Sequence, residues 1–161
     1  YEKEICMGSK RLLIVAHTPS ENTRHMLGAI VQGAQSATND RIDIVAQTAF
    51  ETNSDQVIQA QAIILGTTEN LGYMSGGLKD FFDRIYYPCL EKTQGLPYSL
   101  VIRAGQDGTG TLRAIDKIST GLRWRAVQQA LICRGKWQPK FITQCEELGA
   151  ATALGLDLGV F

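Results

Sequence analysis

Three polar segments of the chain combine residue types that could hold a ligand, and each follows a short apolar run. The first is 17–23 (HTPSENT), the second 67–77 (TTENLGYMSGG) and the third 104–110 (AGQDGTG). Hydroxyl and amide side chains can bind anions, aromatic and thioether side chains can contact planar rings, and glycines bring backbone N–H groups close to a ligand. These segments are therefore the candidate ligand-binding positions.

The first segment is typical of an anion site at the start of a helix. Thr18, Ser20, Asn22 and Thr23 can donate side-chain hydrogen bonds. The first backbone N–H groups of a helix are unsatisfied and add partial positive charge, so no lysine or arginine is needed. The glycine spacing of a dinucleotide fingerprint and the lysine of a P-loop are absent. The alternative is an ordinary capped helix start, and Glu21 disfavours a phosphate unless its side chain points to solvent.

The second segment could line a planar ring. Its glycines, which permit positive φ or close approach of the backbone to a ligand, are Gly72, Gly76 and Gly77. Its flat or polarizable side chains are those of Leu71, Tyr73 and Met74. The alternative is a surface loop before a helix, in which the glycines only serve turns.

The third segment could supply further backbone donors beside the second. Gly105 and Gly108 leave the backbone accessible after the apolar run that ends near Ala104. Gln106 and Asp107 either orient a ligand or act as turn residues.

No set of residues indicates hydrolytic or metal chemistry. His17 and His25 are the only histidines, and the chain has neither a Gly-x-Ser-x-Gly sequence nor a Cys-x-x-Cys pair. We expect His17 to shape its loop and His25 to be exposed in the first turn of a helix.

Other charged and aromatic residues favour structural roles. Asp80 and Asp83, close to Lys79 and Arg84, predict a solvated helix face or local ion pairs. Trp124 lies between two arginines, but the net charge is 0 and no second such cluster occurs. Core or interface contacts are therefore favoured over nucleic-acid binding at Trp124.

Composition predicts one globular, cytoplasmic domain. The chain has 161 residues, of which 44% are hydrophobic and 20% charged, with 16 basic and 16 acidic residues. These values disfavour disorder, and the charge balance disfavours nucleic acid or an acidic membrane surface as the main partner. Cys133 and Cys145 predict buried thiols, which fits a reducing cytoplasm. No apolar run could span a bilayer and no signal peptide is recognised, so we expect one domain over 7–161, with 1–6 an extension or an expression remnant.

The elements that would position the three segments alternate regularly. Apolar runs predict strands at 11–16, 41–46, 62–66, 96–103 and 127–134. Helical spacing predicts helices over 22–34, 53–60, 78–85 (ending before Pro88), 112–122 and 142–156. This alternation predicts a parallel sheet with helices on both faces, in which ligands bind at the carboxyl ends of the strands.

Taken together, the three segments resemble those of flavodoxin-like proteins. The most specific part is 69–84 (ENLGYMSGGLKDFFDR). It is similar to the flavin-contacting loop and following helix of NAD(P)H-dependent FMN reductases and flavodoxin-like quinone reductases. The resemblance extends from Lys10 to Phe161 and is greatest to a bacterial flavodoxin-family group described as NAD(P)H-dependent oxidoreductases. It implies an α/β, flavodoxin-like three-layer sandwich with a five-stranded parallel sheet in the order 2-1-3-4-5.

The resemblance also implies the cofactors, FMN with NADH or NADPH as co-substrate, and the residues that bind FMN. The phosphate loop would contain Thr18, Ser20, Asn22 and Thr23. The first flavin loop would contain Glu69, Asn70, Leu71, Gly72, Tyr73 and Met74. The second flavin loop would contain Ala104, Gly105, Gln106, Asp107 and Gly108. No catalytic side chain or metal is required, because the flavin carries the chemistry.

Two features depart from electron-carrying flavodoxins: Glu21-Asn22 replaces the usual glycine of the phosphate loop, and the net charge is 0 rather than strongly acidic. The leading hypothesis is an oxidoreductase that passes electrons from NAD(P)H through FMN to a quinone, a flavin or a similar small molecule. A flavodoxin-type electron-transfer protein and a non-enzymatic binding module are the alternatives. We expect no nucleic-acid or membrane partner. A homodimer or homotetramer is compatible, because many relatives place the flavin near a subunit interface.

Overall fold

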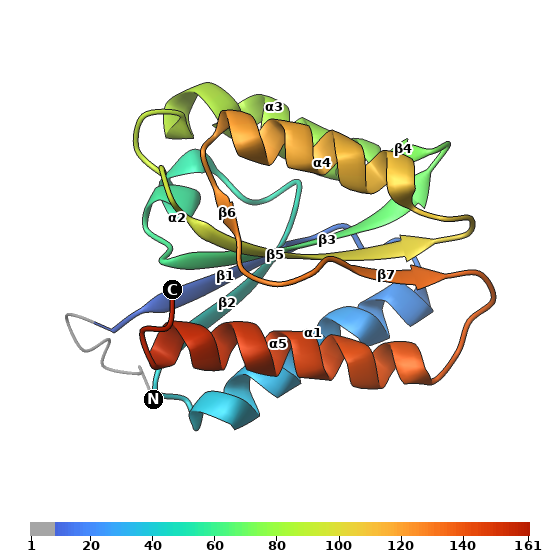
Figure 1. Ribbon diagram of the computed structural model, residues 1–161, viewed down its shortest axis with the longest axis horizontal. Helices are drawn as coiled ribbons and strands as arrows, with labels where there is room; N and C mark the ends of the chain where they lie inside the picture. The colour runs from blue at the N-terminus through green and yellow to red at the C-terminus, as the bar shows by residue number, and fades with distance from the viewer. Residues whose placement is uncertain (1–8) are drawn as a thin grey trace.

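The computed structural model describes residues 9–161, so the expectation for 1–6 lies outside the described residues. Figure 1 shows a central sheet with α1 and α5 on one face and α3 and α4 on the other. The strands are β1 (Arg11–Ala16), β2 (Asp43–Thr48), β3 (Ala62–Asn70), β4 (Tyr73–Met74), β5 (Pro97–Ala104), β6 (Arg125–Ala126) and β7 (Leu131–Arg134). The helices are α1 (Glu21–Thr38), α2 (Ser54–Ile58), α3 (Gly76–Cys89), α4 (Thr109–Gly121) and α5 (Lys140–Asp157).

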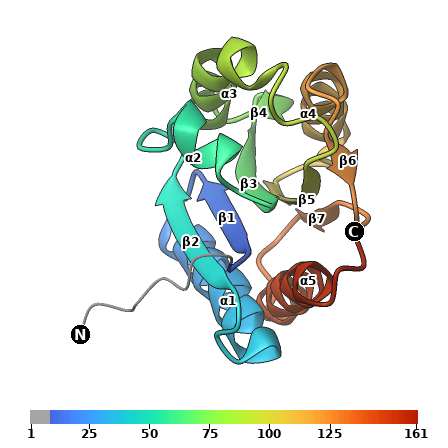
Figure 2. The ribbon, with the colours of Figure 1, turned by 90° about the vertical axis from the view of Figure 1, so that its left-hand side faces the viewer.

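The sheet is parallel apart from the short β4. Its strands run in the order β2-β1-β3-β5, and both β6 and β7 pair with the outer side of β5. The strand β4 pairs antiparallel with the end of β3. Figure 2 shows β2 at one edge and β7 near the other. Counting the predicted strands alone, this is the expected order 2-1-3-4-5.

Alternation along the central strands divides the core into two halves. Leu13 and Val15 of β1 face α2, α3 and α4, whereas Leu12 and Ile14 face α1 and α5. All four side chains are at most 1% exposed. This explains why the strand sequences are nearly continuous apolar runs.

Helices α1 and α5 contact each other at two glycines. A Cβ on Gly33 would lie 2.1 Å from the carbonyl oxygen of Glu146, and one on Gly149 would lie 2.1 Å from that of Ile30. Only glycine allows the two backbones to approach so closely. The crossing fixes where the amino-terminal ends of both helices lie.

The structure corrects three predicted boundaries. A loop was expected from Thr67, but β3 continues to Asn70 because a hairpin with β4 pairs its last residues. The strand expected at 127–134 is split: the short β6 lies just before it, 127–130 form a detour, and only 131–134 form β7. In the detour the Gln128 amide donates to the Thr152 hydroxyl at 2.5 Å. Helix α3 does not end before Pro88, because a proline in the last turn removes only one backbone hydrogen bond.

Several structural expectations are confirmed. Trp124 is 6% exposed, and its indole N–H donates to the Thr93 hydroxyl at 2.9 Å. Cys133 and Cys145 are both buried. Lys79 pairs with Asp83 and Arg84 with Asp80, at 2.6 and 2.8 Å.

Arg84 has a second role that the sequence pattern did not predict. Its guanidinium also donates to the carbonyls of Thr52 and Ala49, both at 2.7 Å, and so holds the loop after β2 against α3. A spacing rule for ion pairs within one helix cannot show a bond to a distant backbone carbonyl.

Neither a membrane-spanning helix nor a metal cluster occurs in the described residues, 9–161. No helix within 9–161 is long and apolar enough to cross a bilayer. Over the same range, no group of three or more His, Cys, Asp or Glu residues could hold a metal ion.

Candidate functional site

The three predicted segments meet at the carboxyl end of the sheet. They lie at the carboxyl ends of β1, β3 and β5, which are adjacent and parallel, so these ends share one edge. In Figure 1 this edge is on the right, where the β3–β4 hairpin, the loop after β5 and the start of α1 lie. The fold thus brings together residues more than 80 positions apart in the sequence.

The first segment forms a capped helix start. The Ser20 hydroxyl accepts a hydrogen bond from the Thr23 backbone N–H at 3.2 Å, and the Thr23 hydroxyl accepts one from the Ser20 N–H at 3.0 Å. This reciprocal pair is a capping box. Both hydroxyls therefore stabilise the helix, as the alternative interpretation of this segment expected.

Other donors of the first segment remain available to a ligand. The backbone N–H groups of Glu21 and Asn22, in the first turn of α1, have no intrahelical acceptor. The Asn22 side chain is exposed and the Thr18 side chain half-buried. The Glu21 side chain is 80% exposed, which is the orientation that leaves room for an anion. The donor set thus fits a phosphate group, with the capping pair beneath it.

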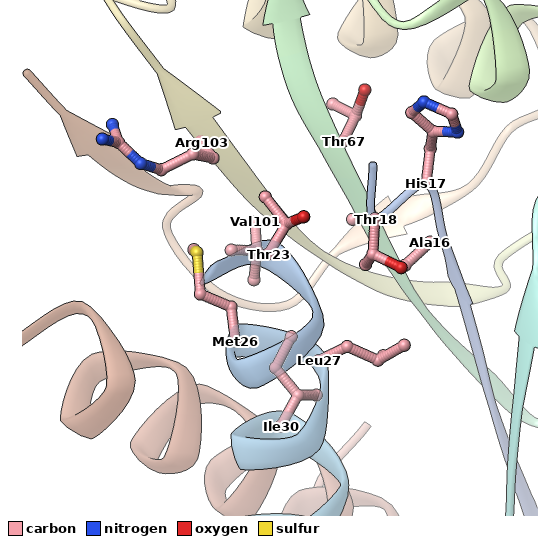
Figure 3. A pocket seen from close by; sticks show the side chains of 11 residues that line it. Ala16, His17, Thr18, Thr23, Met26, Leu27, Ile30, Thr67, Val101 and Arg103 are labelled. Carbon is pink, nitrogen blue, oxygen red and sulfur yellow. The ribbon is translucent and has the colours of Figure 1, made fainter. Parts of the chain in front are cut away.

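A small cavity lies behind this helix start. Its volume is about 20 Å³, and it is lined by residues of β1, α1, β3 and β5 that include His17, Thr23 and Arg103. That volume holds about one water molecule. Figure 3 shows Arg103 at the opposite side of the cavity from His17. A flat ring system cannot enter it, so such a ring would have to bind along the outer edge.

The second segment forms the hairpin of β3 and β4. Leu71 and Gly72 at its tip have φ of 55° and 75°, a left-handed turn that favours glycine. Leu71 is fully exposed and Tyr73 is 40% exposed, so both could contact a ring. Met74 is only 2% exposed and belongs to the core, which corrects the expectation that its side chain offers a contact surface.

The base of the hairpin is held by polar contacts. The Thr67 hydroxyl accepts the Ser75 backbone N–H at 3.0 Å, and the Ser75 hydroxyl in turn caps α3 by accepting the Leu78 N–H at 3.1 Å. A Cβ on Gly77 would lie 2.8 Å from Nδ1 of His17 and 3.1 Å from the Phe50 ring. His17 therefore lies close to Gly77 at the base of the hairpin, and His25 is exposed, as expected.

The third segment is a tight loop before α4. Gly108 has a φ of 71°, and a Cβ there would lie 2.7 Å from the Ile132 side chain. The Thr109 backbone N–H, and then the Thr109 hydroxyl, hold the pKa of Asp107 below its ordinary value. Asp107 is thus a turn residue, while Gly105 and Gln106 are exposed and Ala104 is buried.

Glu69 joins the second and third segments. Its two carboxylate oxygens accept hydrogen bonds from the backbone N–H groups of Gln106, at 3.0 Å, and of Gly108, at 2.8 Å. The resemblance implied Glu69 as a residue of the first flavin loop, and nothing in the sequence predicted its contact with the second. No spacing signal exists for such a bridge, because it depends on the pairing of β3 with β5.

Comparison with known proteins identifies the architecture. No protein-family model and no curated protein sequence matches the chain. Solved structures do match. An archaeal flavodoxin aligns over 89% of this chain and 96% of its own, with a TM-score of 0.75 and 21% identity.

Two further structures agree. The chain has the flavodoxin-like fold. A WrbA-like flavodoxin from Agrobacterium tumefaciens aligns over 90% of this chain and 96% of its own, with a TM-score of 0.72 and 18% identity. An oxidoreductase from Corynebacterium diphtheriae aligns over 92% of this chain and 94% of its own, with a TM-score of 0.65 and 15% identity. At these identities the similarity establishes the flavodoxin-like fold, and ligand and activity must be argued from the site.

Proposed function

We propose that the chain binds FMN at the carboxyl edge of its sheet and acts as an NAD(P)H-dependent oxidoreductase. The observation that carries this proposal is the convergence of three complementary surfaces at one edge. They are the free N–H groups that begin α1, the exposed Leu71 and Tyr73 of the hairpin, and the glycine-containing loop after β5. A phosphate group and a planar ring are the two chemical groups that these surfaces could bind.

The protein's own residues bind and orient the cofactor in this proposal. The amides of Glu21 and Asn22, with the side chains of Thr18 and Asn22, would hold the phosphate. Leu71 and Tyr73 would cover one part of the ring, and the turn at Gly72 would allow the backbone to approach it. Once bound, FMN would supply hydride acceptance from NAD(P)H and electron delivery to a quinone, a flavin or a similar small molecule.

The absorption spectrum of the purified protein tests this proposal. We expect added FMN to bind and its visible bands to shift, and anaerobic NADPH or NADH to bleach them. Binding without bleaching by either nucleotide would favour an electron-transfer protein. A protein that binds no FMN would overturn the proposal and favour a non-enzymatic module.

A further inference from the structure

The carboxylate of Glu69 takes both of its hydrogen bonds from one short loop. Glu69 lies in β3 opposite Met74 of β4, so its backbone is fixed by the hairpin. Its Oε1 accepts the Gln106 N–H and its Oε2 accepts the Gly108 N–H. A carboxylate that accepts two backbone N–H groups makes charge-assisted bonds, which are stronger than neutral ones.

The loop after β5 is exposed and tightly turned, and it is also held by the Asp107–Thr109 hydrogen bonds and by Arg134. It contains a left-handed Gly108 in close contact with Ile132, and its central residues Gly105, Gln106 and Asp107 are all exposed. Among the described residues of the β3–β4 hairpin, Glu69 is the only one whose side chain hydrogen-bonds to this loop; the side-chain hydrogen bonds of Thr67 and Thr68 stay within the hairpin. The pairing of β3 with β5 places the two segments side by side, and the Glu69 side chain adds the hydrogen bonds that tie the hairpin to the exposed part of the loop.

We propose that Glu69 is a positioning residue that holds the second ring-binding loop against the first before any ligand arrives. The proposal rests on the proposed FMN site. Glu69 acts through the loop, because its oxygens are engaged by the protein's own amides. It also places one fixed negative charge between the two segments, which should disfavour an electron-rich, reduced ring there.

Hydrogen exchange of the protein without added FMN tests the contact directly. In the wild type, the amides of Gln106 and Gly108 should be protected. In Glu69→Ala both should exchange roughly tenfold faster or more, because both acceptors are lost. In Glu69→Gln only one of the two amides should exchange faster, because a carboxamide offers a single acceptor oxygen. Unchanged exchange at both amides in Glu69→Ala would overturn the proposal.

FMN binding tests the positioning role separately. We expect Glu69→Ala to bind FMN roughly tenfold more weakly, because the loop must then be ordered at the moment of binding. We expect Glu69→Gln to shift the reduction potential of bound FMN to more positive values, which loss of a merely structural contact would not do. Glu91→Ala, at an exposed position in the loop after α3, is the matched control and should change neither property.

The two proposals can fail independently. If the wild type binds no FMN, the proposed function is overturned, while the exchange pattern still tests the bridge. If the wild type and Glu69→Ala bind FMN equally well, the positioning role is overturned and the proposed function stands.

Discussion

The hydroxyls of Ser20 and Thr23 show how one residue pattern can serve two purposes. Both were expected to hold a phosphate, and the structure uses both in the capping box of α1. The Thr23 hydroxyl also donates to the Ser20 carbonyl at 2.9 Å, whereas the Ser20 hydroxyl, which accepts the Thr23 N–H, can still donate its proton to an anion. Stability and ligand binding are therefore coupled at Ser20, whereas the exposed Asn22 side chain makes no bond of this kind.

Substitutions at Ser20 and Asn22 should separate the contribution to helix stability from the contribution to FMN binding. Ser20→Ala should lower the free energy of unfolding by about 1 kcal/mol through loss of the cap, and should also weaken FMN binding. Asn22→Ala should leave unfolding nearly unchanged and weaken only FMN binding. Urea denaturation and FMN titration of both variants measure this difference. Unchanged FMN affinity in both would move the phosphate away from α1.

Gly72 allows a second test at the residue scale. Its φ of 75° lies where a β-branched residue is strained, and it is at the exposed hairpin tip. Gly72→Val should therefore abolish FMN binding while the protein still folds, at a cost of about 1–3 kcal/mol. Both properties follow from an FMN titration and a urea denaturation curve.

A second glycine provides the control for this variant. Gly95 has a φ of 76° and is also exposed, but it precedes β5 at the opposite end of the sheet. Gly95→Val should cost similar stability and leave FMN binding intact. If Gly72→Val bound FMN as the wild type does, the ring would not lie against the hairpin tip.

At the scale of elements, the crossing of α1 and α5 determines where the helix start of the site lies. Gly33 and Gly149 allow the two helices to touch through backbone atoms on one face of the sheet. A larger residue at either position would push the helices apart. The amino-terminal end of α1, which carries the proposed phosphate donors, would then move as well.

Alanine at two positions of the same helix should give opposite results. Gly33→Ala should destabilise the protein by about 1–3 kcal/mol, because its Cβ has no room beside Glu146. Gly28→Ala is the control: it is exposed, its Cβ would meet nothing within 4 Å, and alanine is the better helix former, so a gain of about 0.5–1 kcal/mol is expected. Thermal or urea unfolding measures both. Equal effects of the two substitutions would contradict the close helix contact.

At the scale of the whole molecule, the balance of charge affects how stable the reduced, anionic form of a bound flavin would be. The net charge is 0, and the acidic residues of the two proposed flavin loops are Glu69 and Asp107. Arg134 lies beside them and donates to the Asp107 carbonyl at 2.7 Å. The site therefore lacks the dense negative field that would strongly penalise a fully reduced, anionic flavin.

This charge distribution predicts that the two one-electron reduction potentials of bound FMN lie close together. On this scale, a tenfold change in a one-electron equilibrium constant corresponds to about 59 mV. Anaerobic NADPH or NADH should convert oxidised FMN directly to its two-electron-reduced form, with little long-wavelength absorbance. Reductive titration by dithionite provides the comparison without nucleotide. Large, persistent long-wavelength absorbance with no response to either nucleotide would favour an electron carrier instead.

The sequence by itself determined the alternation of strands and helices along the chain and the three segments at the carboxyl ends of β1, β3 and β5. Burial on both faces makes these strands continuous apolar runs, and helices repeat at a different period, so both are visible locally. The hairpin, the split of the fifth strand and the extension of α3 were missed. Each depends on a partner from outside the segment, or on a proline whose cost is small only at a helix end.

Only the tertiary structure decided what individual side chains do at the site. The Met74 side chain is buried in the core, and Ser20 and Thr23 hydrogen-bond to each other. The Glu69 carboxylate accepts hydrogen bonds from the loop that contains Gln106 and Gly108. Hydrogen bonds and burial are set by atoms a few ångströms apart, and strand pairing brings together residues that are distant in sequence. A linear pattern therefore indicates which residues could bind a ligand, while the assembled sheet decides which donors remain free for it.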